Sequence, residues 1–170
     1  AASALYQDFN QFSGANAQLQ TEMIQTTASL ESLGISSSTT AGNIALATNA
    51  FGMTAKESTA LQDDLAKTAM AIGMPPAKLA AEFGKAAPQL ASYGKKGIEV
   101  FKNMAAASKG LGVEMGTLLN LTGQFDTFEG AANAAGSLNA VLGGDLLNSM
   151  DMLNATEDER IRMILQATDA

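Results

Sequence analysis

The sequence predicts an all-α fold, and three observations lead to that prediction. The strong helix formers dominate its 170 residues, with 32 Ala, 19 Leu and 9 Met, whereas Val and Ile together number 10. Sixteen glycines lie mainly between apolar stretches, and the apolar residues within those stretches recur at helical spacing. We therefore expect an irregular bundle of about six to eight short helices, joined by tight Gly-containing turns and without a sheet.

Glycines at nearly equal intervals predict where the helices end. The glycines at positions 34, 52, 73 and 94 each stand directly after an apolar or aromatic residue. Glycine adopts the left-handed conformation that commonly follows a helix, and an apolar residue beyond it packs back on the last turn. Solenoid proteins use two helices per longer repeat, so we favour an irregular bundle. The predicted structural helix stops are Gly34, Gly52, Gly73, Gly94, Gly112 and Gly143.

The first half of the chain then divides into four predicted helices. One ends at Gly34, and a second follows the hydroxyl side chains of residues 36–38, which can accept hydrogen bonds from free amides. Thr54 and Glu57 have the spacing of a capping box and begin the third helix. The fourth begins near Pro76, and Pro88 predicts a bend or break near residue 86.

Four further stretches of helical character follow. An apolar stripe from Ile98 leads to the stop at residue 112, and Asp126 is a candidate cap for a helix that ends near residue 142. Residues 145–153 predict a short helix. Thr156 and Glu159 form a second capping-box pattern, for a helix over 157–168.

As domains we expect an N-terminal helical segment, 1–34, and a helical bundle domain, 35–170, with a further division near 94–112 as an alternative.

Charge is low and unevenly distributed along the chain. The net charge is −7, with eight lysines and five acids between residues 56 and 109 and an acidic excess on either side. Lysines and acids alternate at helical spacing, which predicts ion pairs within one helix in two groups: Lys78, Glu82, Lys85 and Lys95, Glu99, Lys102. Clustered arginines and stacking aromatic residues are missing, so we expect no specific nucleic-acid partner.

The residue types argue against an enzyme. The sequence has neither His nor Cys, which removes the commonest general base, the thiolate nucleophile and the usual zinc ligands. We therefore predict no catalytic residues, no metal site and no cofactor. One weaker alternative is a peptidoglycan hydrolase, because Glu57-Ser58 resembles the Glu-Ser pair of lytic transglycosylases and carboxylates gather at 63–64 and 157–159. The Gly-Leu-Met-Gln element of that family is absent.

The longest uncharged run does not suggest a membrane span. Residues 32–55 come close to the required length, but glycine, serine and asparagine interrupt them repeatedly. We expect no stable transmembrane span.

Two stretches in the second half resemble a known family. Residues 111–121, LGVEMGTLLNL, and residues 124–132, QFDTFEGAA, are similar to tail tape measure proteins of long-tailed bacteriophages and related prophage particles. The Ala-rich, short-helix style of residues 33–165 is also similar to that family. The resemblance implies a structural protein that acts in tail assembly, tail length determination and genome ejection.

The same resemblance implies partners and a location. Tail tube and tail tip proteins are the expected partners, together with other copies of the chain as a homo-oligomer within the tail and the host envelope on ejection. The implied location is the virion, in the tail lumen or tip, after assembly in the host cytoplasm. Because the glycine stops exclude one long helix, the chain corresponds to a folded segment and not to the ruler itself. The alternative is a secreted helical translocator or pore-forming protein.

Overall fold

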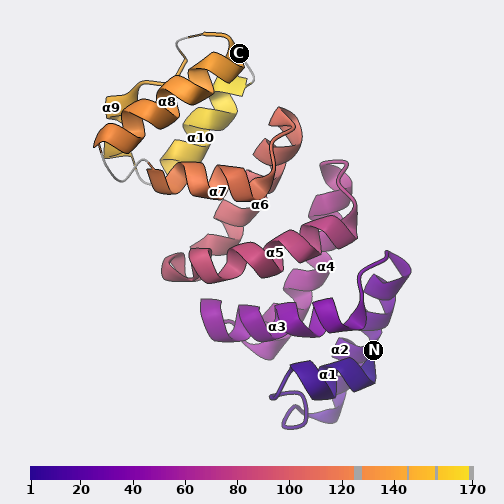
Figure 1. Cartoon of the computed structure of the whole chain (residues 1–170). Coiled ribbons are helices and arrows are strands. Elements are labelled where there is room, and N and C mark those ends of the chain that lie inside the picture. The colour runs from indigo at the N-terminus through magenta and orange to yellow at the C-terminus, as the bar shows by residue number, and fades with distance from the viewer. Residues whose placement is uncertain (125–127, 145, 156, 169–170) are drawn as a thin grey trace. The chain divides into compact units, whose positions relative to one another are not determined.

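The computed structural model describes residues 1–124, 128–144, 146–155 and 157–168 (Figure 1). These residues form ten α-helices and one 3-10 helix, and none of them lies in a strand. The all-α prediction is therefore confirmed, although the helices exceed the expected six to eight. Helices as short as the first, with 7 residues, complete fewer than two turns and show no periodic pattern in the sequence.

The helices have the following bounds. The first part of the chain contains α1 (Ala2–Asp8), α2 (Ala17–Ser32), α3 (Ser37–Phe51), α4 (Ala55–Ala71), α5 (Pro76–Leu90) and the 3-10 helix η1 (Ala91–Tyr93). The second part contains α6 (Lys96–Leu111), α7 (Met115–Gln124), α8 (Phe128–Leu142), α9 (Ser149–Asn154) and α10 (Glu157–Thr168).

The chain divides into two compact units. Unit 1 is residues 1–102 and unit 2 is residues 103–170, so the division lies within α6. It falls inside the range 94–112 that the sequence offers as an alternative boundary. The boundary expected after residue 34 lies within unit 1, where α2 contacts both α3 and α4. The turn at Gly34 is too short to separate α2 from the helices that follow it.

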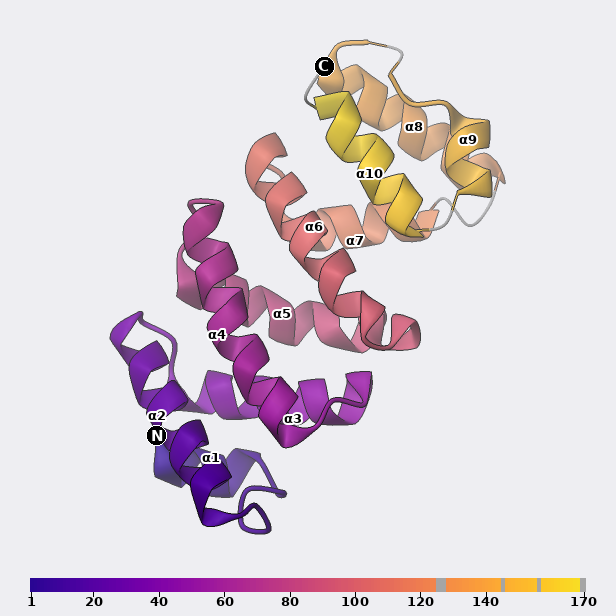
Figure 2. The same ribbon diagram turned by 180° about the vertical axis from the view of Figure 1, so that it is seen from behind.

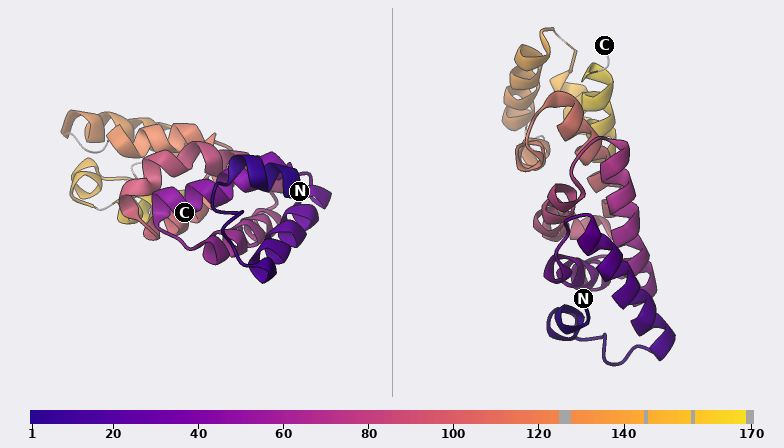
Figure 3. Two further views of the ribbon diagram at one scale, coloured as in Figure 1. Left: turned by 90° about the horizontal axis from the view of Figure 1, so that it is seen from below. Right: turned by 90° about the vertical axis from the view of Figure 1, so that its right-hand side faces the viewer.

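Unit 1 is built as two layers of alternate helices. Helices α1, α3 and α5 lie one above another, and α3 contacts both of its neighbours in this row (Figure 1). Helix α4 crosses α3 and α5 on the other side and also contacts α2 (Figure 2). The side view in Figure 3 shows the same two layers. The glycines that follow α2, α4 and α6 are Gly34, Gly73 and Gly112, which are equally spaced along the chain. Within unit 1, alternate helices thus stack on one another, α1 on α3 and α3 on α5.

A row of three phenylalanines joins α3, α5 and α6 within unit 1. The rings of Phe51 and Phe83 stack at a centroid distance of 6.0 Å, and Phe83 meets Phe101 edge to face at 5.2 Å. All three side chains are buried. Such aromatic pairs add about 0.5–1.5 kcal/mol each beyond the burial of their surface.

Small residues bring α3 and α5 close together. The buried Asn43 of α3 donates a hydrogen bond from Nδ2 to the carbonyl oxygen of Ala80 at 2.9 Å. A Cβ atom on Gly84 would lie 3.1 Å from Asn43 Oδ1, so α5 presents its bare backbone at this point. The same close fit recurs at Gly97, where a Cβ atom would lie 2.6 Å from the Leu90 carbonyl oxygen and 2.8 Å from the ring of Phe51.

The predicted helix ends correspond to features of the backbone. The six glycines with positive φ are the six predicted stops, and no other described residue has a positive φ. Ser36 and Thr54 cap α3 and α4 by accepting hydrogen bonds from backbone amides three residues on. Pro76 is the first residue of α5.

Two expected details differ in the structure. Helix α5 is not interrupted near Ala86 but continues through Pro88 to Leu90, because a proline in the last turn removes only one hydrogen bond from the helix. The short helix expected over 145–153 begins at Ser149, where Asn148 caps it by accepting hydrogen bonds from the backbone amides two and three positions further on. Asp145 lies outside the described residues.

Unit 2 has its own core between α8, α9 and α10. Its buried members are Ala131, Ala134, Ala135, Leu138, Leu147, Met152, Ile164 and Ala167. Asn139 of α8 holds the segment before α9: its Oδ1 accepts hydrogen bonds from the amides of Leu146 and Leu147, and its Nδ2 donates to the Leu147 carbonyl. The buried Arg160 of α10 donates to the carbonyls of Met152 and Leu153 at the end of α9.

We expect Gly97→Ala to destabilise the chain by about 1–3 kcal/mol, because the new methyl group would collide with the Leu90 carbonyl and the Phe51 ring. Gly42→Ala is the matched control, since a Cβ atom at this helical position meets no atom within 4 Å. It should stabilise the chain by about 0.5–1 kcal/mol. Urea unfolding followed by circular dichroism measures both changes. Equal effects of the two variants would contradict the close packing at Gly97.

We also expect Asn139→Ala to destabilise unit 2 by about 1–3 kcal/mol, because it leaves the part-buried amide and carbonyl of Leu147, together with the exposed amide of Leu146, without their partner. Asn139→Asp keeps the acceptor for both amides but sets a carboxylate oxygen against the Leu147 carbonyl, so it should protect the two amides from exchange better than Asn139→Ala does. Hydrogen exchange of the amides at 146 and 147 measures the change at the site itself. Unchanged exchange in Asn139→Ala would contradict this role.

Candidate functional site

The predicted capping box of α4 is also part of an interhelical site. Thr54 Oγ1 accepts a hydrogen bond from the Glu57 amide at 3.2 Å, and the Thr54 amide donates to Glu57 Oε2 at 2.8 Å. The other carboxylate oxygen of Glu57 accepts a hydrogen bond from Lys95 Nζ at 2.8 Å, across from the start of α6. One carboxylate therefore both begins α4 and links it to α6.

This environment sets the charge state of Glu57. The hydrogen bond from Lys95, followed by those from the backbone and side chain of Thr54, lowers the pKa of the Glu57 carboxyl from 4.5 to about 2. A general acid in glycoside hydrolysis requires the opposite shift, because it must hold a proton near neutral pH. The geometry favours a fixed negative charge at this position.

A second ion pair joins the same two helices. Lys102 of α6 donates a hydrogen bond to Asp64 of α4, two helical turns beyond the pair of Glu57 and Lys95. Both pairs link residues that are 38 positions apart in the sequence. Both ion pairs therefore join two different parts of the chain and do not lie along a single helix.

A groove of about 470 Å³ lies between α4 and the start of α6 within unit 1. Glu57 and Lys95 line one part of it, and Asp64 contributes from the next turns of α4. Between the ion pairs, Leu61 and Ile98 supply apolar surface. The groove combines an apolar centre with charged groups along its borders.

A second hollow lies in unit 2. It has a volume of about 350 Å³ and is lined by residues of α10 and of the segment around α9, including Leu147, Asp151, Met163 and Ala167. Leu146 and Met150 are exposed nearby.

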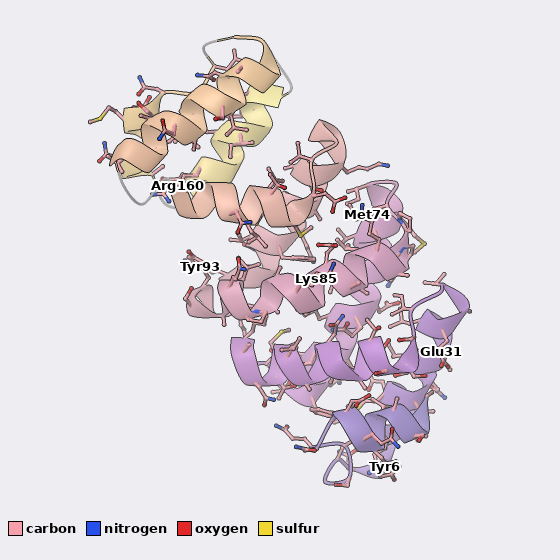
Figure 4. The ribbon with its side chains drawn as sticks, in the orientation of Figure 1. Tyr6, Glu31, Met74, Lys85, Tyr93 and Arg160 are labelled. Carbon is pink, nitrogen blue, oxygen red and sulfur yellow. The ribbon has the colours of Figure 1, made fainter. Side chains whose placement is uncertain are left out.

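In unit 1, Figure 4 places the exposed rings of Tyr6 and Tyr93 at distant positions, so they do not form one patch.

The remaining predicted site residues do not gather around a common centre. Glu159 is exposed on α10, while the other two predicted caps, Asp126 and Thr156, lie outside the described residues. Asp63 pairs with Lys67 at 2.6 Å on its own helix, apart from the Asp64 pair. Of the acidic cluster 157–159, Glu159 alone has a described side chain.

The lysine pairing within α6 was predicted wrongly. Lys95 and Lys102 pair with Glu57 and Asp64 of α4, whereas the sequence predicts pairs with Glu99 on their own helix. In the first group, Lys85 does pair with Glu82, at 3.2 Å (Lys85 is labelled in Figure 4). The signal that indicates the cross-helix pairs is the equal separation between the two acids and between the two lysines.

Among the described residues, no helix is both long and apolar enough to cross a membrane. The same residues contain no group of three or more potential metal ligands. Comparison with protein-family models, with curated proteins and with solved structures gives no match to this chain.

We expect the stability of the chain to depend on pH through Glu57. Its lowered pKa means that the ionised carboxylate contributes stability above about pH 4.5, and that this contribution is lost as the pH falls toward 2. Glu57→Gln keeps a capping side chain but cannot ionise. Its urea midpoint should therefore change less between pH 4.5 and pH 2 than that of the wild type.

Two further variants control this measurement. Lys95→Gln removes the largest cause of the lowered pKa and should also flatten the pH dependence. Lys56→Gln changes the exposed neighbouring lysine and should leave the wild-type pH dependence intact. Identical pH profiles for the wild type and Glu57→Gln would contradict the role of Glu57.

Proposed function

We propose that this chain is a folded segment of a bacteriophage tail tape measure protein. The observation that carries the proposal is the resemblance of residues 111–121 and 124–132 to that family. The first stretch runs from the end of α6 through the turn at Gly112 into α7, and α8 contains the end of the second. The proposed role is structural, in tail assembly, tail length determination and genome ejection.

The arrangement of charged groups supports a structural role over a catalytic one. Glu57 caps a helix and pairs with Lys95, Asp64 pairs with Lys102, and Asp63 pairs with Lys67. Of the carboxylates that a hydrolase hypothesis would use, Glu57, Asp63 and Asp64 are thus each engaged in an ion pair with a lysine. We propose a protein without enzymatic activity of its own.

Helix length supports the assignment to a folded segment. The longest described helix, α4, has 17 residues and so extends about 25 Å. A molecular ruler needs much longer continuous helix, and the glycine turns of this chain prevent it. The proposed partners are tail tube and tail tip proteins, other copies of the chain and, on ejection, the host envelope, and the proposed location is the tail lumen or tip of the virion.

Mass spectrometry of tail particles tests the proposal. Particles are purified from the strain that encodes the chain, and we expect tryptic peptides from both units to co-purify with intact tails through a density gradient. An in-frame deletion of residues 37–111, which removes α3 to α6, should abolish or shorten the tails seen by electron microscopy. A synonymous recoding of the same codons is the control. Absence of the peptides from intact tails would refute the proposal.

Liposome leakage separates this function from the alternative of a pore-forming protein. The purified chain at neutral pH should leave dye-loaded vesicles of phosphatidylcholine and phosphatidylglycerol intact. Concentration-dependent leakage would favour a translocator or pore-forming protein instead.

A further inference from the structure

The groove between α4 and α6 is bordered by two matching stripes of residues. On α4 the stripe runs from Glu57 to Asp64, and the facing stripe runs from Lys95, directly before α6, to Lys102 on α6. Residues three, four and seven positions apart lie on one face of a helix, so each stripe faces the other helix along about two turns. The two ion pairs hold the helices at both ends of this stretch.

Between the ion pairs the surface is apolar and open. Leu61 and Ile98 are buried at the base, with 5% and 8% of their surfaces exposed. Ala60 is exposed at the border of the groove. Its short side chain leaves room above Leu61, where a longer residue on α4 would reach toward α6. The groove is therefore open to the outside above Leu61.

One carboxylate at this opening has no counterpart within the described part of the chain. Glu99 is exposed, lines the groove and makes no ion pair with another described residue. Glu57 and Asp64 are each neutralised by a lysine, so Glu99 gives the groove a surplus negative charge. Phosphate groups would be repelled here, and a purely apolar ligand would leave the charge of Glu99 unused.

The ligand that complements this surface has an apolar stem and a cationic end. The side chains of lysine and arginine have this form, because their methylene groups cover apolar surface while the charged group stays in water. We propose that the groove binds a lysine or arginine side chain on a polypeptide segment of a partner protein. The methylene stem lies on Ala60, Leu61 and Ile98, and the cationic group pairs with Glu99. The inference concerns unit 1 alone and stands independently of the proposed function.

Nuclear magnetic resonance tests the site directly on the full chain. The uniformly ¹⁵N-labelled protein is titrated with the blocked peptide acetyl-Ala-Ala-Lys-Ala-Ala-amide. We expect saturable shifts at the backbone amides of residues 57–64 and 95–102. Matched peptides with norleucine or glutamate in place of lysine should produce weaker shifts, since norleucine keeps the stem without the charge and glutamate reverses the charge.

Variants locate the binding to the groove. Glu99→Gln should weaken binding of the lysine peptide by about fivefold, the effect of one exposed ion pair. Ala60→Leu should abolish binding by filling the opening, and its circular dichroism should match that of the wild type, because Ala60 is exposed on a helix. Asp8→Asn removes an exposed carboxylate on α1 and should leave the affinity unchanged.

Four results would overturn the proposal, and the last of them concerns free lysine. The first is the absence of saturable shifts, and the second is an equal response to the lysine and norleucine peptides. The third is a response that is spread over the acidic residues of unit 2 and insensitive to both groove variants, which would indicate general attraction to a negatively charged protein. Binding of free lysine as tightly as the peptide would likewise replace a protein partner by an amino-acid ligand.

Discussion

Helices α3 and α5 can lie close together because the residues between them are small. Asn43 bonds directly to the backbone of α5, and Gly84 leaves no side chain in the way. This approach places Phe83 between Phe51 and Phe101, which brings the start of α6 onto the same core. A chain with few large apolar residues thus obtains a dense core by reducing the distance between its helices. The high alanine and glycine content is the means by which that distance is reached.

The position of α6 in turn determines the character of the groove. Gly97 allows the first turn of α6 to sit against Leu90 and Phe51. From there, the side of α6 that carries Lys102 faces α4, and the two ion pairs link the facing residues. Aromatic packing at the base and charge pairing at the borders therefore act on the same turns of α6. The groove results from this arrangement, and its excess negative charge comes from one residue, Glu99.

Local features of the fold were predictable from sequence, whereas contacts between helices were not. The glycines that follow several of the helices and the pair of Thr54 and Glu57 depend on residues within a few positions of one another, so their patterns are visible in one dimension. Lys95 has acids both on its own helix and on α4, and the sequence alone does not distinguish them. The stacking of alternate helices was not predicted for a similar reason. Each predicted stop is a glycine after an apolar or aromatic residue, and this local pattern does not show which helices stack.

The layered order of unit 1 has a mechanical consequence. The contacts of α1 to α5 join helices that are neighbours or next neighbours along the chain. Under tension, such a stack opens from one end, because removal of a terminal helix pair leaves the contacts of the next pair in place. The pair formed by α3 and α4, with its turns, runs from Gly34 to Gly73. When fully extended, a segment of this length spans on the order of 130 Å. Unfolding of this one pair of helices would therefore add most of that span to the length of the chain.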